Sequence, residues 1–373
     1  MITSARATLA IAGKDLCAAR RRPLFPALVV VVSALFVGVY ALVVQVSATT
    51  PAAVADGGGS EPLHAALADL DSVDGPMLEL RTSEPAQARR LFEDGATNAL
   101  LALPDLGEAT GGDAPATLTL EVRNLNSDLV KNVELRAEQA VRDYATAHTD
   151  ADLVTVHETP QFDADMRIST YLGTALLLFA VMFAATVGTG ALTAAEWEQR
   201  TAKAAVLSPA GPLPLLAGKW LSGAAISAAA LALVLPALAV VLDYPVTSLG
   251  LPALVGIGAL WWYGAGIGAL LGMLLRRSLP LVPVCVVISV LHLLISGYES
   301  YIRGFAHDGA VAALWRATHW WPTAALADQI RFDAAGTAVA VDWLATAGAS
   351  TVATAAALAA VLLHRRLAFT HGQ

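Results

Sequence analysis

A glycine followed by a lysine, Gly218-Lys219, is the first feature of this 373-residue chain that could do chemistry. A phosphate-binding loop needs a glycine, four further residues and then Gly-Lys-Ser/Thr, so that backbone N–H groups cradle the phosphate and the hydroxyl reaches magnesium. Here the preceding Gly211 lies seven positions before Gly218 instead of five, and Trp220 replaces the hydroxyl residue. Two prolines in between also remove backbone donors. The sequence therefore excludes a nucleotide site in this segment.

Other reactive side chains form no familiar constellation. The two cysteines, Cys17 and Cys285, lie far apart without the spacing of a disulfide framework or a metal site, and the eight histidines are scattered. HExxH and GxSxG motifs and paired intramembrane aspartates are missing from the sequence, so an intramembrane enzyme has no candidate residues. We expect no catalytic residue, metal or cofactor in this chain.

The composition indicates an integral membrane protein. Hydrophobic residues make up 56% of the chain and charged residues 14%, against about 25% charged in a typical soluble domain. Apolar runs of spanning length, about 20 residues, account for the excess. We expect an all-α membrane bundle of six transmembrane helices, over residues 24–46, 168–194, 213–242, 251–275, 279–296 and 343–363.

The first apolar run has a second interpretation as a signal peptide. Arg20, Arg21 and Arg22 precede it, and Ala53-Val54-Ala55 resembles a cleavage site. However, the apolar region of a signal peptide is only about 7–15 residues long, and this run exceeds that length. We therefore favour an uncleaved span.

An acidic soluble block follows the first span, over residues 47–166. Between residues 46 and 166 there are 22 acidic and 7 basic residues, whereas the remainder of the chain is mildly basic. A Pro/Ala/Gly linker (TTPAAVADGGGS) is expected to open the block. Alternating polarity then predicts strands in PMLELRT and TLTLEVRN, NALLALP reads as an apolar strand, and EPAQARRLFEDG and SDLVKNVELRAEQAVRDYATAH read as helices. These elements predict a small α+β domain inserted after the first helix.

The distribution of basic residues predicts the topology. With six spans both termini share one face, and lysine and arginine in short loops concentrate on that face, which marks it as cytoplasmic. The acidic domain then lies outside. We expect a multi-pass protein of a bacterial cytoplasmic membrane, with both termini in the cytoplasm.

The segment from Glu196 to Leu207 predicts a short amphipathic helix on the cytoplasmic face, between the second and third spans. Trp197 can face lipid or the bundle, while its acidic and basic residues offer contacts to water or to a protein. Ser208-Pro209 is expected to end the helix, because a residue before proline avoids the helical region. An ordinary connecting loop, whose basic residues only fix the topology, is the alternative.

The order of residues in this loop resembles the cytoplasmic loop of type-2 ABC exporter permeases. The resemblance rests on an acidic-X-acidic pair, Arg-Thr, an apolar residue before Ser-Pro, and Gly-Lys about ten residues later. The matching positions are Glu196, Glu198, Arg200, Thr201, Leu207, Ser208, Pro209, Gly218 and Lys219. Residues 202–205 are less apolar than the usual run after the threonine. The layout also resembles the branch with a large external domain after the first span.

The resemblance implies a division of the chain and a set of partners. Residues 1–23, with Lys14-Asp15-Leu16, would form a cytoplasmic interface helix; within 167–373, residues 195–212 would be the loop that couples to an ATPase subunit, and 297–342 an external re-entrant segment. ATP and magnesium would belong to the ATPase subunit. A homodimer, or pairing with a similar permease, would supply the usual twelve spans.

Three further features carry alternatives. The spacing of Gly264, Gly268 and Gly272 lets helices approach closely, either within the bundle or at a dimer interface. His292 is either a packed residue or a proton relay. Glu299 and Arg303 would pair on a short helix, and by family resemblance they would form, with Gly297, part of an external gate.

The function expected from these features is the permease subunit of an ATP-driven exporter. Scarcity of charge within the predicted spans argues against proton or sodium coupling and suits a hydrophobic or amphipathic cargo, including a lipid. The alternative is a membrane-anchored binding or sensory protein that acts through its external domain.

Overall fold

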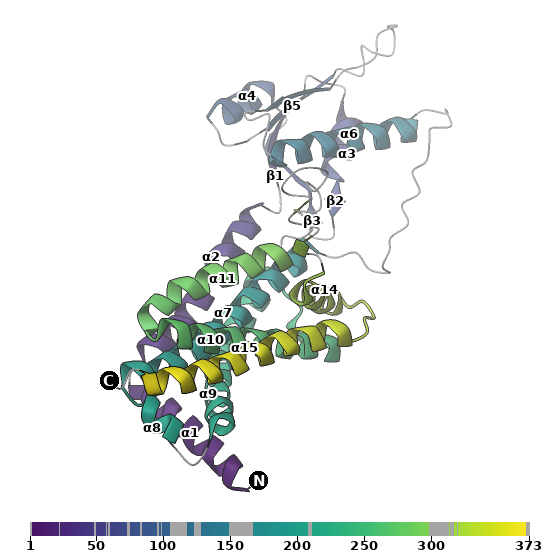
Figure 1. Cartoon of the computed structure of the whole chain (residues 1–373). Helices are drawn as coiled ribbons and strands as arrows, with labels where there is room; N and C mark the ends of the chain where they lie inside the picture. The colour runs from purple at the N-terminus through teal and green to yellow at the C-terminus, as the bar shows by residue number, and fades with distance from the viewer. Residues whose placement is uncertain are drawn as a thin grey trace. The chain divides into compact units, whose positions relative to one another are not determined.

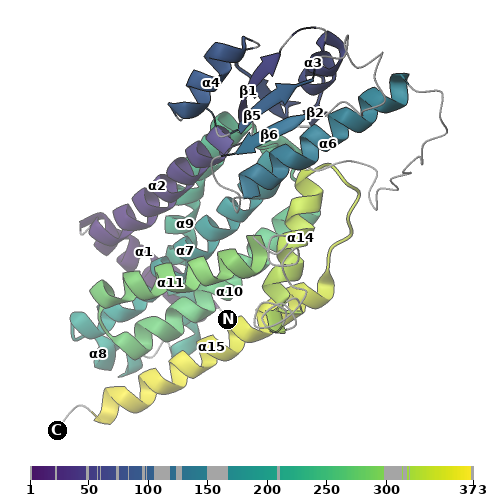
Figure 2. The same ribbon diagram turned by 90° about the horizontal axis from the view of Figure 1, so that it is seen from above.

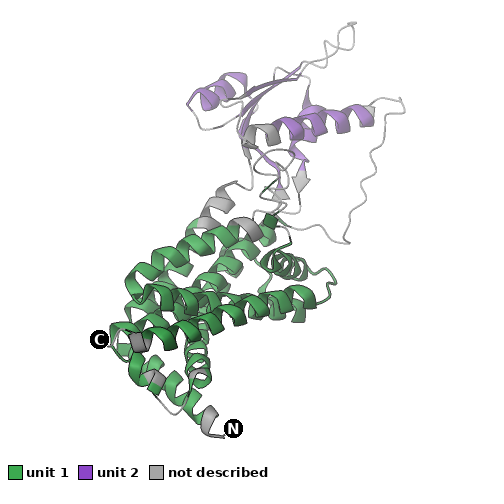
Figure 3. Ribbon diagram, in the orientation of Figure 1, with its two compact units in different colours: residues 1–43, 162–373 green, residues 44–161 purple. Residues whose placement is uncertain are grey.

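A computed structural model of the chain divides it into two compact units, residues 1–43 with 162–373 and residues 44–161 (Figure 3). We call them the helical unit and the α/β unit. The structure describes residues 2–21, 23–47, 50–56, 58, 60–72, 75–82, 84–94, 97, 99–104, 118–122, 128–148, 167–207, 211–297, 313, 317–318, 320 and 321–370.

Nine α-helices are described in the helical unit (Figure 1). They are α1 (Ile2–Arg21), α2 (Leu24–Ser47), α7 (Ile168–Glu198), α8 (Ala202–Leu207), α9 (Pro212–Leu242), α10 (Leu251–Leu275), α11 (Ser278–Gly297), α14 (Pro322–Ala334) and α15 (Trp343–Thr370), with a 3-10 turn, η1 (Val246–Ser248), before α10.

Four of these helices, α7, α9, α10 and α15, are long and apolar enough to cross a membrane. The α1–α2 pair bends by 78° and adds a fifth span if it is counted as one broken element, while the apolar stretch of α11 over Ser278–Leu293 is shorter than a span. The described residues therefore support a helical membrane bundle with four or five candidate spans. The count of six stays a prediction.

Helix α7 is the centre of the helical unit. It contacts α9, α10, α11 and α14, and 94% of its most apolar stretch is buried (Figure 2). Small and hydroxyl-bearing residues make this possible. The Thr189 hydroxyl donates to Ala185 O at 2.6 Å and lies 3.1 Å from Ala265 O of α10, so a polar group is satisfied inside the helix pair.

The glycine stripe of α10 packs within the chain, against α7. Gly264, Gly268 and Gly272 all face that helix, and a Cβ added at Gly268 or Gly272 would run into the backbone oxygen of Thr186 or of Gly190. The absence of a side chain at these positions sets the distance between the two helices. Of the two alternatives that the spacing left open, the described contacts are those of packing within the bundle.

We predict that Gly272→Ala destabilises the helical unit, because its new methyl group must push α10 away from α7. Overpacking of this kind costs about 1–3 kcal/mol. The matched control is Gly258→Ala on the same helix, where an added Cβ meets nothing within 4 Å. Thermal unfolding of the purified protein in lipid nanodiscs measures the difference. Equal melting temperatures for the two variants would contradict the packing assignment.

The α/β unit contains a four-stranded sheet in the order β4-β1-β5-β6. Strands β1, β4 and β5 are parallel and β6 is antiparallel. Its elements are β1 (Thr50–Asp56), α3 (Glu61–Ala68), β2 (Asp71–Ser72), β3 (Gly75–Pro76), β4 (Leu78–Leu80), α4 (Pro85–Glu93), β5 (Ala99–Leu103), β6 (Thr119–Val122) and α6 (Asp128–His148).

The expected linker at the start of this unit is wrong, because TTPAAVADGGGS contains the central strand β1. Val54 pairs with Leu101 of β5, and Ala52 and Ala53 are fully buried. A central parallel strand is buried on both faces and need not alternate in polarity, so its short alanine-rich sequence was indistinguishable from a linker. The sequence resembling a cleavage site thus lies inside the sheet.

The last residue of β1 forms hydrogen bonds with residues that follow the strand. Asp56 accepts hydrogen bonds from the Ser60 hydroxyl and, at 2.9 Å, from the Gly58 N–H. These two bonds stabilise the carboxylate and lower the pKa of Asp56. The Asp56 carboxylate therefore connects the end of β1 to Gly58 and to Ser60, the residue before α3.

Candidate functional site: a buried charge cluster at the turn between α7 and α8

The connection between α7 and α9 consists of two helical pieces, not the single amphipathic helix predicted from Glu196 to Leu207. Helix α7 continues to Glu198, and Arg200 adopts a left-handed backbone conformation with φ of 56°. This conformation ends α7, and Thr201 then leads into α8. Ser208 and Pro209, which were expected to end the helix, lie outside the described residues.

Four charged side chains meet just inside this turn, and we call them the charge cluster: Lys14 and Asp15 of α1, Glu196 of α7 and Lys219 of α9. Lys219 Nζ lies 2.9 Å from Glu196 Oε1 and 3.3 Å from Asp15 Oδ2. Lys14 Nζ lies 2.7 Å from the same Glu196 oxygen and 3.3 Å from Asp15 Oδ1. Two cations thus face two carboxylates.

Three members of the charge cluster are almost entirely removed from solvent. The exposed fractions of the Lys219, Glu196 and Asp15 side chains are 5%, 4% and 6%. Charges this deeply buried are tolerated only when they are paired and hydrogen-bonded. Lys219 Nζ also donates to Leu192 O at 2.8 Å, and the Thr201 hydroxyl donates to Glu196. The cluster is therefore neutral in sum and well supplied with hydrogen bonds.

The Gly218-Lys219 dipeptide lies where α1 crosses α9. A Cβ added at Gly218 would lie 2.7 Å from Ile11 Cβ and 3.0 Å from Thr8 O, so the glycine lets α1 cross closely over α9. At this crossing the next residue, Lys219, reaches carboxylates on both α1 and α7. Lys219 is therefore more than a residue that fixes topology.

Glu198 holds the start of α11. Its Oε1 accepts from the Ser278 N–H at 2.7 Å, and its Oε2 accepts from the Ser278 hydroxyl at 3.1 Å. A carboxylate at this place satisfies free backbone donors and interacts favourably with the helix dipole. The acidic-X-acidic pair thus makes two different intramolecular contacts, one to the charge cluster and one to α11.

Trp197, between the two acidic residues, contacts residues at the ends of α10 and α15. Its ring packs edge-on against His364 of α15 at 5.3 Å, and Arg276, at the end of α10, lies over it at 5.2 Å. A ring nitrogen of His364 is 3.3 Å from Ala202 O of α8. Both Figure 1 and Figure 2 show α8 beside the C-terminal end of α15.

The remaining residues of the predicted loop divide by exposure. Arg200 and Lys203 are exposed, and Leu207 is 71% exposed. The structure brings Glu196, Thr201 and Lys219 together, with Gly218 beside them at the helix crossing. Trp197 and Glu198 instead contact other helices. The pairing with Lys14 and Asp15 was not predicted from the sequence, because no local pattern around these two residues indicates which distant charges they contact.

The two weaker predictions have separate outcomes. His292 is packed and partnered, since its ring nitrogens lie 3.1 Å from the Tyr263 hydroxyl and 2.8 Å from Ile288 O. Gly297 is the last residue of α11, but Glu299 and Arg303 lie outside the described residues. The external gate stays a prediction.

Comparison with known families decides the class. A family profile described as ABC-2 family transporter protein matches residues 24–359. The chain belongs to this family. No curated protein and no solved structure matches it. The match confirms the resemblance to a type-2 ABC transporter permease, and so identifies a transmembrane transport subunit. Permeases of the ABC-2 family work with an ATPase subunit.

We predict that Lys219→Met strongly destabilises this permease, because it leaves two buried carboxylates with one cation. Breaking a buried ion pair in this way costs about 3–5 kcal/mol. Lys203→Met removes an exposed charge from the adjoining α8 and is the matched control. Thermal unfolding in nanodiscs reports the loss.

The double variant Lys219→Met/Glu196→Gln tests the cause. It restores the balance of charge, and we expect it to unfold at a higher temperature than Lys219→Met alone. The charge cluster would lose its assigned role if Lys219→Met melted at the same temperature as Lys203→Met.

Proposed function

We propose that this ABC-2 permease is the membrane subunit of an exporter, which moves a hydrophobic or amphipathic small molecule or a lipid outward. A separate subunit hydrolyses ATP on the cytoplasmic side, and two permease copies, identical or similar, form the transport unit. The α/β unit lies outside the cell in this arrangement. The observation that carries the proposal is the charge cluster directly beneath an exposed turn.

The charge cluster allows the exposed turn to transmit movement to several helices. Arg200 and the exposed face of α8 offer basic and apolar groups to a partner. Glu198, before Arg200, is bonded to α11, and Ala202, after it, is bonded to α15. Lys219 and Asp15 join α9 and α1 to α7. An ATPase subunit that displaces the turn therefore displaces several helices together.

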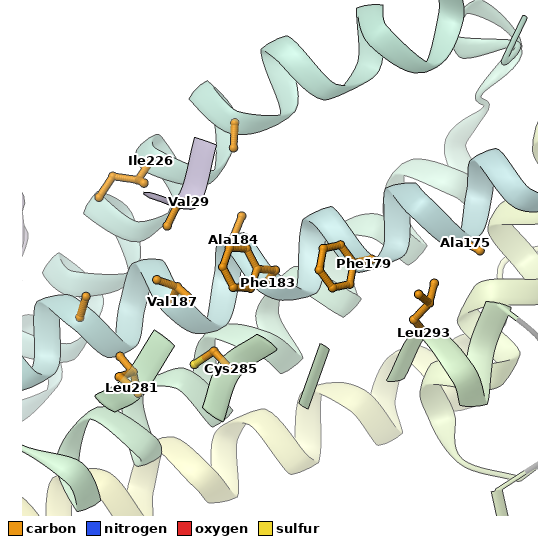
Figure 4. Close-up of a cluster of buried hydrophobic side chains, with 12 residues drawn as sticks. Val29, Ala175, Phe179, Phe183, Ala184, Val187, Ile226, Leu281, Cys285 and Leu293 are labelled. Atoms are coloured by element: carbon orange, nitrogen blue, oxygen red, sulfur yellow. The ribbon is translucent and has the colours of Figure 1, made fainter. Parts of the chain in front are cut away.

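The character of the span-length helices supports an apolar cargo. Each of the four has an 18-residue window with at most two charged residues. The buried hydrophobic cluster drawn in Figure 4, between α2, α7, α9 and α11, contains Phe179 and Phe183 stacked at 5.9 Å. A bundle with so few charges and so apolar an interior offers little to a strongly hydrated solute and suits a molecule with apolar parts.

The double charge reversal Arg200→Glu/Lys203→Glu tests the contact with the ATPase. We expect about a tenfold weaker association with the ATPase subunit, because the reversal changes the charge of the docking face without touching buried groups. Arg142→Glu, an exposed reversal in α6 of the α/β unit, is the control. Co-purification and the hydrolysis rate of the reconstituted complex measure the effect.

Two results would count against this function. Unchanged association in the double reversal would remove the turn from the ATPase contact. Failure of the unmodified chain to bind any ATPase would overturn the exporter itself and favour a binding or sensory protein that acts through the α/β unit.

A further inference from the structure

A cavity of about 250 Å³ opens beside the charge cluster, between α1, α2, α7, α9 and α11. A single buried water needs only roughly 10–15 Å³, so this space holds a small organic group. It lies wholly within the helical unit. The residues that line it indicate the chemical class of ligand that it would bind.

The lining is apolar at its base. Val29, Val187, Ala191 and Ile226 contribute there, and the exposed fraction of each is at most 8%. Figure 4 shows Val29, Val187 and Ile226 gathered at one end of the hydrophobic cluster. An alkyl or aryl group fits this base, because contact with it removes apolar surface from water.

The mouth of the cavity is polar and carries unbalanced negative charge. Lys14, Glu198 and Gln199 line it and are exposed. The positive charge of Lys14 is already matched within the charge cluster, where two cations face two carboxylates. Glu198 accepts only from Ser278 among the described contacts, and it has no ion pair there. One carboxylate is thus left to face the opening.

We propose that this cavity binds a lipophilic cation, with its apolar part against Val29, Val187, Ala191 and Ile226 and its cationic head at Glu198. Glu198 is the charged lining residue that takes no part in the charge cluster, and one such carboxylate beside an apolar base fixes both the class and the orientation of the ligand. The proposal deepens the exporter function and rests on it for the meaning of the site, since the ligand would then be a cargo entering from the cytoplasmic side.

Direct binding tests the site without an ATPase. Decyltrimethylammonium, labelled with a photoreactive diazirine in its chain, is added to the full-length protein in nanodiscs of zwitterionic phospholipid. We expect saturable cross-linking to α2 and α7 near Val29 and Val187. The decyl sulfonate analogue, with the same chain and the opposite charge, is expected to bind at least about tenfold more weakly.

Two variants separate the apolar base from the charged mouth. Ala191→Phe fills the base and is expected to weaken binding of the cation about tenfold or more, whereas Val240→Phe, on an 84% exposed position of α9, leaves it unchanged. Glu198→Gln keeps an oxygen for Ser278 and removes the charge. It is expected to weaken the cation about fivefold and to leave a neutral decyl alcohol probe unaffected.

Each outcome bears on one claim. Equal binding of the cation and the sulfonate, or no effect of Glu198→Gln, would overturn the charge preference. Unchanged cross-linking in Ala191→Phe, with a melting temperature equal to that of Val240→Phe, would overturn the cavity as the binding site. Because no step requires ATP, binding that persists in a chain without an ATPase partner would retain the site while the exporter function fails.

Discussion

Neutral pairing of buried charge is the constraint on which the helical unit depends. Lys219, Glu196 and Asp15 come from three helices far apart in sequence, and each would be strongly unfavourable at its depth without the others. The lysine can reach both carboxylates only where α1 and α9 cross closely, which Gly218 permits. A polar requirement and a steric one therefore meet at a single crossing.

Small residues at the helix contacts determine the packing of the rest of the helical unit. Because α7 is enclosed on nearly all sides, α10 approaches it through glycines. The threonine hydroxyls of α7 donate to its own backbone oxygens, at Thr174, Thr186, Thr189 and Thr193. Side-chain volume near the middle of the bundle thus fixes helix positions, while charge fixes them near the turn between α7 and α8. The cavity beside the turn lies where the first kind of packing gives way to the second.

Hydropathy and residue order predicted much of this arrangement, and the misses have physical causes. The four span-length helices follow from apolar length, and the type-2 permease class follows from the order of residues between Glu196 and Lys219. Sequence could not assign Glu196 to the interior, because an acidic residue at a helix end is normally solvated. It also could not pair Asp15 with Lys219, since 204 positions separate them. Such pairing is a property of helix crossings, which one sequence does not record.

The place of β1 in its sheet has a consequence for synthesis of the chain. This strand is made first, yet its two neighbours are β4 and β5, so one edge stays unpaired until Leu80 has been added and the other until Leu103. An open strand edge invites pairing with the wrong chain. Alanine, aspartate and proline, which have low strand propensity, make up most of TPAAVAD, and they disfavour a stable strand before the correct partners exist. The composition that makes β1 resemble a linker in sequence thus also disfavours mispairing of this strand during synthesis.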